Sequence, residues 1–212
     1  MIVLLRKNYH GRENILAPRK AGEVCATIDY ESIAKAVLFT ENHFKQTFGK
    51  EKFMSKFRIV PLSKEFAEKI RQSRKDEFGN DVVEQIATGY GPCRVSLTPF
   101  TPGKDKRLLF SHSPFTTRNA FNQNGPVFIH EKEVEPYSDI YRFPPAIKAD
   151  KVKFPLSLIG YSSKQKMVFT KLVGDVDVDE LIVKIFDEHP KVEFLHARNA
   201  EACCYICKIE RA

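Results

Sequence analysis

Three of the five cysteines lie close together near the carboxyl end of the chain, at Cys203, Cys204 and Cys207. Thiolates bind zinc and act as nucleophiles, and a Cys-x-x-Cys pair is a common spacing for either use. We expect residues 202–210 to form a strand, however, in which Cys203 and Cys207 would lie about 13–14 Å apart on one face, with Cys204 on the other. One zinc ion with Zn–S bonds of about 2.3 Å cannot span that distance. The spacing therefore predicts buried cysteines that pack as small apolar side chains.

Thiol catalysis remains an alternative at Cys93 or Cys204, if the fold brings an arginine or a histidine next to one of them. The general base would then be His112 or His196, each of which ends an expected strand. His130 also ends an expected strand, and three imidazoles that met could hold a catalytic zinc ion. No His-Glu-x-x-His motif and no carboxylate at a matching spacing accompanies them, so we predict no metal site.

A different chemistry, the binding of a small anion, is indicated by arginines that lie beside apolar or amide side chains. The candidate ligand-binding residues are Arg94, Arg118, Arg198 and Asn199. Such an arginine either forms a structural ion pair, for instance with Glu84 or Glu193, or clamps a carboxylate or phosphate. Nucleotide motifs are missing: "GYGPCR" is not a dinucleotide fingerprint, and "TPGKDK" lacks the first glycine and the hydroxyl residue of a phosphate-binding loop. We expect no cofactor.

The elements that must position these residues are mostly short strands. Alternating or apolar runs bounded by turn residues predict strands at 57–60, 81–88, 125–133, 192–200 and 202–210, with hairpins that pair 93–100 with 107–113 and 154–163 with 166–174. Apolar stripes predict helices at 63–72, capped by Ser63, and at 177–189, capped by Asp177 or Asp179. Because runs of hairpins separate the helices, we predict an α+β fold with a mostly antiparallel sheet and two or three helices.

Two long connections, 113–125 and 131–155, are rich in aromatic residues and exceed the usual length of a loop in a compact domain. Residues 1–53 differ from the rest. They include an amphipathic pattern that predicts a helix within 31–53, but the preceding stretch has no clear period. We therefore predict a single α+β domain at 54–212. Residues 1–53 are either a real, weakly packed extension or an artefact of a translation start assigned upstream of Met54.

Composition limits the function further. The chain has 212 residues, a net charge of +7 and ordinary apolar and charged fractions of 42% and 29%. Acidic and basic residues interleave along the chain, which argues against a dedicated nucleic-acid binder. No apolar run is long enough for a signal peptide or a membrane span. The odd number of cysteines forms no disulfide framework, so we expect a cytoplasmic protein with free thiols, whose oligomeric state the sequence leaves open.

Four stretches in order, "GPCRVSL", "RLLFSHSPF", "GPVFIHEKE" and "HARNAEACCYICKIER", make the chain from about Phe57 to Arg211 similar to the family called domain of unknown function 1203. The resemblance implies a small, single-domain, cytoplasmic bacterial protein without an assigned activity. In the family pattern the matching positions are Cys93, Arg94, Asn199, Ala200, Cys204 and the Ile209–Arg211 end. The chain departs from it at Cys203, where a glycine is usual, and at Ile159, where an arginine is frequent. If that arginine bound an anion, this chain has lost one contact.

Three hypotheses follow. The first is a module that binds a small anionic ligand in a pocket between the sheet and the 113–125 loop, through Arg94, Arg198 and Asn199. The second is a protein-interaction or structural role, which predicts an exposed aromatic patch or an extended sheet edge. The third is a thiol-dependent enzyme that uses Cys93 or Cys204. The sequence leaves open whether the chain is an enzyme, because a shared fold does not transfer function.

Overall fold

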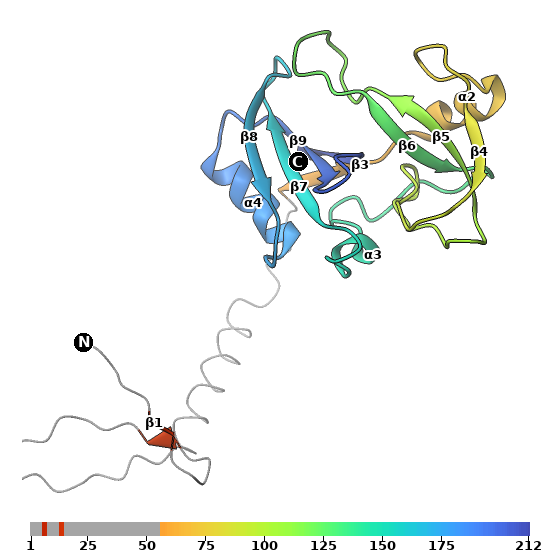
Figure 1. Ribbon diagram of the computed structural model, residues 1–212. Helices are drawn as coiled ribbons and strands as arrows, with labels where there is room; N and C mark the ends of the chain where they lie inside the picture. Colours follow the sequence, from red (N-terminus) through yellow and green to blue (C-terminus); the bar gives the residue numbers. More distant parts are fainter. Residues whose placement is uncertain (1–5, 8–12, 15–55) are drawn as a thin grey trace, which may run out of the picture. The chain divides into compact units, whose positions relative to one another are not determined.

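A computed structural model describes residues 6–7, 13–14 and 56–212 of the chain (Figure 1). The chain divides into two compact units, Met1–Phe53 and Met54–Ala212. In the first unit, β1 (Arg6–Lys7) and β2 (Glu13–Asn14) pair antiparallel. The helix predicted within 31–53 and the weak packing predicted for the extension lie outside the described residues.

The second unit contains two antiparallel sheets, as the sequence predicts for an α+β fold. The five-stranded sheet has the order β3 (Phe57–Val60), β10 (Tyr205–Arg211), β9 (Phe194–Asn199), β7 (Leu156–Tyr161) and β8 (Met167–Leu172). The three-stranded sheet has the order β4 (Val83–Ile86), β5 (Lys106–His112) and β6 (Gly125–His130). The predicted β7–β8 hairpin is confirmed, and β9 and β10 close the chain as neighbours.

The described residues include three helices: α2 (Lys64–Ser73), α3 (Pro145–Lys148) and α4 (Val178–Glu188). The first begins at Ser63, whose hydroxyl accepts a hydrogen bond from the Phe66 amide at 3.1 Å. The third begins at Asp177, whose carboxylate accepts from the amides of Asp179 and Glu180. These side chains satisfy amides that have no partner within the helix, which is why the caps could be predicted from the sequence.

Each sheet has its own apolar core. The five-stranded sheet packs Leu158 and Leu195 against Ile182 and Phe186 of α4, which covers one of its faces (Figure 1). The three-stranded sheet packs residues such as Leu108 against α2. Because side chains alternate between the two faces of a strand, the residues of β7 and β9 between these core positions project from the face opposite α4.

The predicted strand at 93–100 is wrong. Cys93 to Leu97 form a tight turn in which the Leu97 amide donates to the Cys93 carbonyl, and Leu97 has a φ of 53°. Pro92 and Pro99 flank this turn as an isolated bridge. Proline has no amide hydrogen to donate to a sheet, so this segment cannot continue as a paired strand. The hairpin partner of β5 is instead β4.

The predicted strand at 202–210 starts three residues late, at Tyr205. Cys203 and Cys204 lie in the turn after β9, where the Asn199 side-chain oxygen accepts hydrogen bonds from the amides of Glu201 and Ala202. Cys203 has a φ of 58°, in the left-handed region. Cys203 therefore does not share a strand with Cys207, and the predicted separation of about 13–14 Å between them does not apply, although Cys207 is in the strand as expected.

Substituting Cys203→Gly should stabilise the protein by up to about 1 kcal/mol. A side chain in the left-handed region costs about 1–2 kcal/mol, of which the extra freedom of glycine in the unfolded chain takes back part. Urea unfolding measures the difference. Cys204→Gly is the control in the same turn, and because Cys204 is not left-handed, it should lose about 0.5–1 kcal/mol. A loss of stability in both variants would contradict the prediction.

Candidate functional site

The face of the five-stranded sheet opposite α4 carries a row of side chains that could bind a ligand. In the β7–β9 ladder, Tyr161 lies opposite Phe194, Ile159 opposite His196, and Ser157 opposite Arg198. Cross-strand partners share a face, so these six side chains lie together. Ile159 is thus a direct cross-strand neighbour of His196.

Gly160 fixes the position of Tyr161 on this face. A Cβ atom at Gly160 would lie only 2.9 Å from the Cβ of Phe169 and 2.9 Å from Cγ2 of Val192. Glycine therefore allows β7 to approach these neighbours closely on the core side. Any larger residue would push the strand, and Tyr161 with it, out of place.

Aromatic rings surround His196. Its ring centroid lies 4.7 Å from that of Tyr161, 5.2 Å from that of Phe194 and 5.1 Å from that of Tyr205. Phe115, which comes from the long connection between β5 and β6, approaches Tyr161 and His196 edge-on at 5.1 and 5.0 Å. His196 is thus enclosed by rings that supply no hydrogen-bonding partner for its two nitrogens.

Five buried polar atoms in this cluster have no hydrogen-bonding partner: the Tyr161 hydroxyl, both ring nitrogens of His196, and Nε and Nη2 of Arg198. Only Nη1 of Arg198 is engaged, by donating to the Cys203 carbonyl at 3.0 Å. A buried polar group without a partner costs about 1–3 kcal/mol. Five such atoms in one cluster indicate either a binding surface or a site filled by water.

Burial also sets the protonation of the cluster. It lowers the pKa of His196 to about 2, with the nearby Arg198 charge acting in the same direction, so the imidazole is neutral at physiological pH. Burial raises the pKa of Tyr161, while the adjacent Arg198 guanidinium opposes this rise. The two groups are close enough for this charge effect, although their geometry is not that of a hydrogen bond. Tyr161 therefore keeps its proton, and its hydroxyl can donate a hydrogen bond.

Arg94 contacts the backbone of Tyr205, a member of the cluster, and so joins the two stretches that the sequence singled out. Its Nε donates to the Tyr205 carbonyl and its Nη1 to the Pro92 carbonyl. Burial lowers its pKa to about 10, and the acidic groups that act on it are the thiols, Cys204 first, and the Tyr205 hydroxyl. The turn at Cys93 is thus in contact with the start of β10.

Neither Arg94 nor Arg198 forms an ion pair within the described part of the chain, and both side chains are buried. The alternative of a structural pair with Glu84 does not hold, because Glu84 pairs with Arg74 and Lys106. A buried guanidinium without a counter-charge is costly, so the region favours the entry of a negative group.

Two of the three candidate histidines come together around Tyr205. His112 contacts the Tyr205 ring at 5.7 Å, and its Nδ1 lies 2.7 Å from a Glu77 oxygen. Burial lowers the pKa of His112, and Glu77 opposes this by favouring the charged form. His130 lies apart, with its ring 4.5 Å from that of Phe100. Among the described residues, no group of three or more His, Cys, Asp or Glu could hold a metal ion.

The remaining candidates lie outside the cluster. Arg118 is exposed, and it forms no hydrogen bond or ion pair with the residues that the structure describes. The Asn199 oxygen is used in the β9–β10 turn. Cys93 is fully buried, and the half-buried Cys204 donates from Sγ to the Ala202 carbonyl at 3.5 Å. Sequence reasoning named Arg198 and His196 but missed Tyr161, Phe194 and Tyr205, whose alternation matches half-buried strands and carries no ligand signal of its own.

The family model described as "protein of unknown function (DUF1203)" matches residues 89–211. This range covers more than half of the chain. The chain belongs to the DUF1203 family. The match includes the whole buried cluster and Arg94, whereas Glu77 precedes it. The comparisons with curated proteins and with solved structures found no significant match. Within the described ranges, no helix of this DUF1203 protein is long and apolar enough to cross a membrane.

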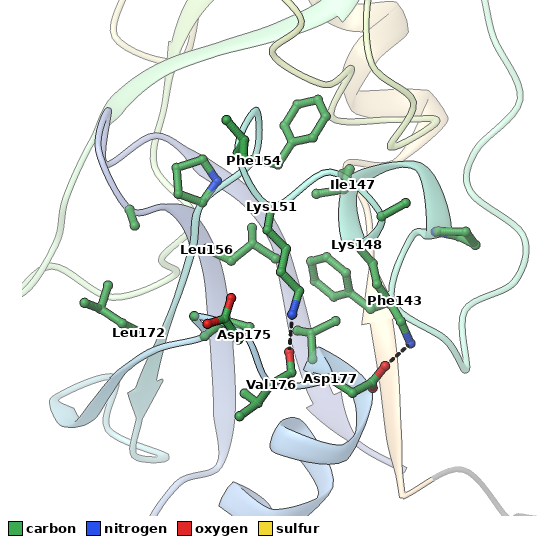
Figure 2. A pocket seen from close by; sticks show the side chains of 18 of the residues that line it. Phe143, Ile147, Lys148, Lys151, Phe154, Leu156, Leu172, Asp175, Val176 and Asp177 are labelled. Atoms are coloured by element: carbon green, nitrogen blue, oxygen red, sulfur yellow. Dashed lines mark hydrogen bonds and ion pairs between the residues drawn. The ribbon is translucent and has the colours of Figure 1, made fainter. Parts of the chain in front are cut away.

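The DUF1203 domain also has an open cavity of about 940 Å³ between α3, the segment 149–156 and the connection from β8 to α4 (Figure 2). Its floor is apolar, and none of the unpartnered atoms lines it. Figure 2 shows that its lysines already have partners: Lys148 pairs with Asp177 at 2.7 Å, and Lys151 donates to the Val176 carbonyl at 3.1 Å. The unmet hydrogen bonds therefore favour the buried cluster over this cavity.

Thiol labelling should separate the cysteines by burial. Of the four cysteines in the described residues, iodoacetamide should modify the exposed Cys203 first and the half-buried Cys204 more slowly in the native protein, because only accessible thiolates react. Cys93 and Cys207 should react only after denaturation, since both are buried and burial raises the pKa of Cys207 to about 12. Peptide mapping by mass spectrometry reads the order. Rapid native labelling of Cys93 at mildly acidic pH would instead favour a thiol-dependent enzyme.

Proposed function

We propose that this DUF1203 protein binds a small anionic ligand over the sheet face formed by Tyr161, His196 and Arg198. The observation that carries the proposal is the free edge of the Arg198 guanidinium. Nε and Nη2 lie on the same side of the group and form the fork that grips a carboxylate or phosphate with two parallel hydrogen bonds. Both are buried without a partner, while Nη1 on the other side is engaged.

Charge supports the same function. Arg94 and Arg198 bring two buried positive charges to the region, with no carboxylate paired to either in the described residues. An anion on Arg198 would offset the cost of this burial. Arg94 has its own carbonyl partners, so it contributes to the electrostatic potential and holds the start of β10, while Arg198 makes the direct contact.

The neighbouring groups complete an anion site. Tyr161 keeps its proton and can donate from its hydroxyl to a second ligand oxygen. Neutral His196 carries one N–H and one acceptor nitrogen, so it can donate to an oxygen or accept from a protonated group. Arg118 and Asn199 have no part in this site, because one is exposed and the oxygen of the other belongs to the turn.

Anion binding should appear as stabilisation. At a ligand concentration of about 100 times Kd, a small carboxylate or phosphate should add about 2.7 kcal/mol, which raises Tm by several degrees. Arg198→Met should abolish the shift, and Arg118→Met, an exposed arginine, should retain it. Differential scanning fluorimetry at constant ionic strength, with chloride as the reference anion, measures both. A shift of equal size in the Arg198→Met variant would overturn the proposal.

A protein-interaction role is the second candidate, favoured by the edge strand β8. Val168 and Leu172 of this strand are exposed, and the edge has no neighbour in the described sheet. Exposed lysines at 164, 166 and 171 surround them, and edge lysines are a common protection against strand pairing. Sedimentation velocity tests the role. Concentration-dependent association that Leu172→Asp abolishes would favour it over anion binding alone.

A further inference from the structure

We infer that the ligand of this site is a small acid with an aromatic ring, and that the ring of Phe115 occupies the place of the ligand ring in the present structure. The inference rests on the proposed function and names its substrate class. It follows from the composition of the site, in which rings and hydrogen-bond donors lie side by side.

The ring wall is built by the strands. Phe194 stacks on Tyr161 with their centroids 5.4 Å apart and an interplanar angle of 17°. Tyr205 meets His196 edge-to-face on the β10 side. Aromatic pairs prefer such stacked and edge-on contacts. A ligand that touches Tyr161 and His196 thus meets ring surface, which favours an aromatic group over an aliphatic chain.

Phe115 already makes the contacts that such a ligand would make. It approaches both Tyr161 and His196 edge-on, at 5.1 and 5.0 Å. It differs from the other rings in two respects. The strand residues Tyr161, Phe194, His196 and Tyr205 are buried, whereas Phe115 is half-buried and comes from a connection without helix or strand.

Five hydrogen bonds hold the connection around Phe115 to the β7–β8 turn, and all of them involve Gln165. The Gln165 side-chain oxygen accepts from the amides of Thr116 and Thr117 at 3.0 and 3.3 Å. Asn119 donates to the Gln165 carbonyl at 3.4 Å. The Thr116 and Thr117 bonds are exposed to solvent, where opening costs little free energy. Phe115 can therefore leave the site without disturbing either core.

The acid group then finds the free donors. Arg198 follows His196 by two residues on the same face of β9, a separation of about 7 Å along the strand. A ring in the place of Phe115 with a carboxylate on it, or one methylene away, reaches from the rings toward Arg198 and Tyr161. The acid satisfies the vacant Nε and Nη2 of Arg198, while the ring replaces the contacts of Phe115.

Isothermal titration calorimetry on the full chain tests the inference with benzoate, phenylacetate, acetate, inorganic phosphate and benzyl alcohol. Burying a ring contributes roughly a tenfold to hundredfold gain in affinity. We expect benzoate or phenylacetate to bind at least tenfold more tightly than acetate. Phe115→Ala should tighten the aromatic acid by about tenfold and leave acetate unchanged, because the ligand no longer competes with the protein's own ring.

Phe121→Ala is the matched control, since Phe121 is an exposed phenylalanine of the same connection. It should leave every affinity unchanged. Gln165→Ala releases the connection without altering the ring wall, so it should speed association of the aromatic acid in stopped-flow measurements. This second variant keeps the test valid if Phe115→Ala folds poorly.

The outcomes separate the two proposals. If acetate and phosphate bind as tightly as the aromatic acids and Arg198→Met abolishes this, the inference is overturned and the proposed function stands. If no anion binds, both fail. If benzyl alcohol binds as tightly as benzoate, the acid group is not recognised and both fail again. An equal gain in Phe121→Ala and Phe115→Ala would overturn the assigned role of Phe115.

Discussion

Replacing His196 by phenylalanine should stabilise the protein and weaken anion binding at the same time. Both nitrogens of His196 are buried without a partner, and its neighbours are rings, so a phenyl ring fits the same contacts and removes two unmet polar atoms. We expect a gain of about 1–2 kcal/mol at pH 7 in urea unfolding, and an affinity for the anion that falls about tenfold. Opposite changes in stability and binding are typical of a functional site.

The same variant should change the response to acid. The unfolded histidine has a pKa near 6.5, while burial lowers that of folded His196 to about 2. Below pH 6.5 the His196 imidazole binds a proton in the unfolded state but not in the folded state. His196 therefore costs the wild type about 1.4 kcal/mol of stability for each pH unit from 6.5 down toward 2. His196→Phe should lose this dependence, measured as the free energy of unfolding between pH 7 and 4.5.

His130→Phe is the control for this pH effect. His130 is half-buried against Phe100, outside the cluster, and its pKa is lowered mainly by burial. The His130→Phe variant should retain most of the pH dependence of the free energy of unfolding and should bind the anion as tightly as the wild type. An unchanged acid slope in His196→Phe would contradict the buried neutral state of His196.

The same substitution should destabilise the protein at one buried arginine and leave its stability nearly unchanged at the other. Arg94→Met removes charge-assisted hydrogen bonds to the carbonyls of Tyr205 and Pro92 and leaves both acceptors buried, so we expect a loss of about 3–5 kcal/mol. Arg198→Met gives up one bond to the Cys203 carbonyl but also removes two unmet donors, so stability should stay within about 1 kcal/mol.

Urea unfolding and calorimetry with benzoate separate these roles. Arg94→Met should unfold at lower urea concentration, and Arg198→Met should fold normally but fail to bind. Equal losses of stability in the two variants would show that Arg198 is as structural as Arg94. Circular dichroism confirms that each variant keeps its sheets before the comparison is made.

Local signals determined much of this protein. The caps at Ser63 and Asp177 could be predicted because a cap involves residues only two or three positions apart. The β7–β8 hairpin could be predicted because a polar turn separates two apolar runs. The α+β class followed from the order of such elements. Alternation predicted a strand at 93–100, but two prolines and a left-handed Leu97 make this segment a tight turn.

The proposed site depends on the tertiary structure. Which strand lies beside which is a non-local choice, and the ladder that puts Ile159 opposite His196 joins residues far apart in the chain. Arg94 meets the Tyr205 carbonyl across 111 positions, a contact that no spacing in the sequence encodes. From the sequence alone, Arg198 could form a structural ion pair or clamp an anion. Burial without an ion-pair partner among the described residues, which depends on everything packed around Arg198, argues against the ion pair.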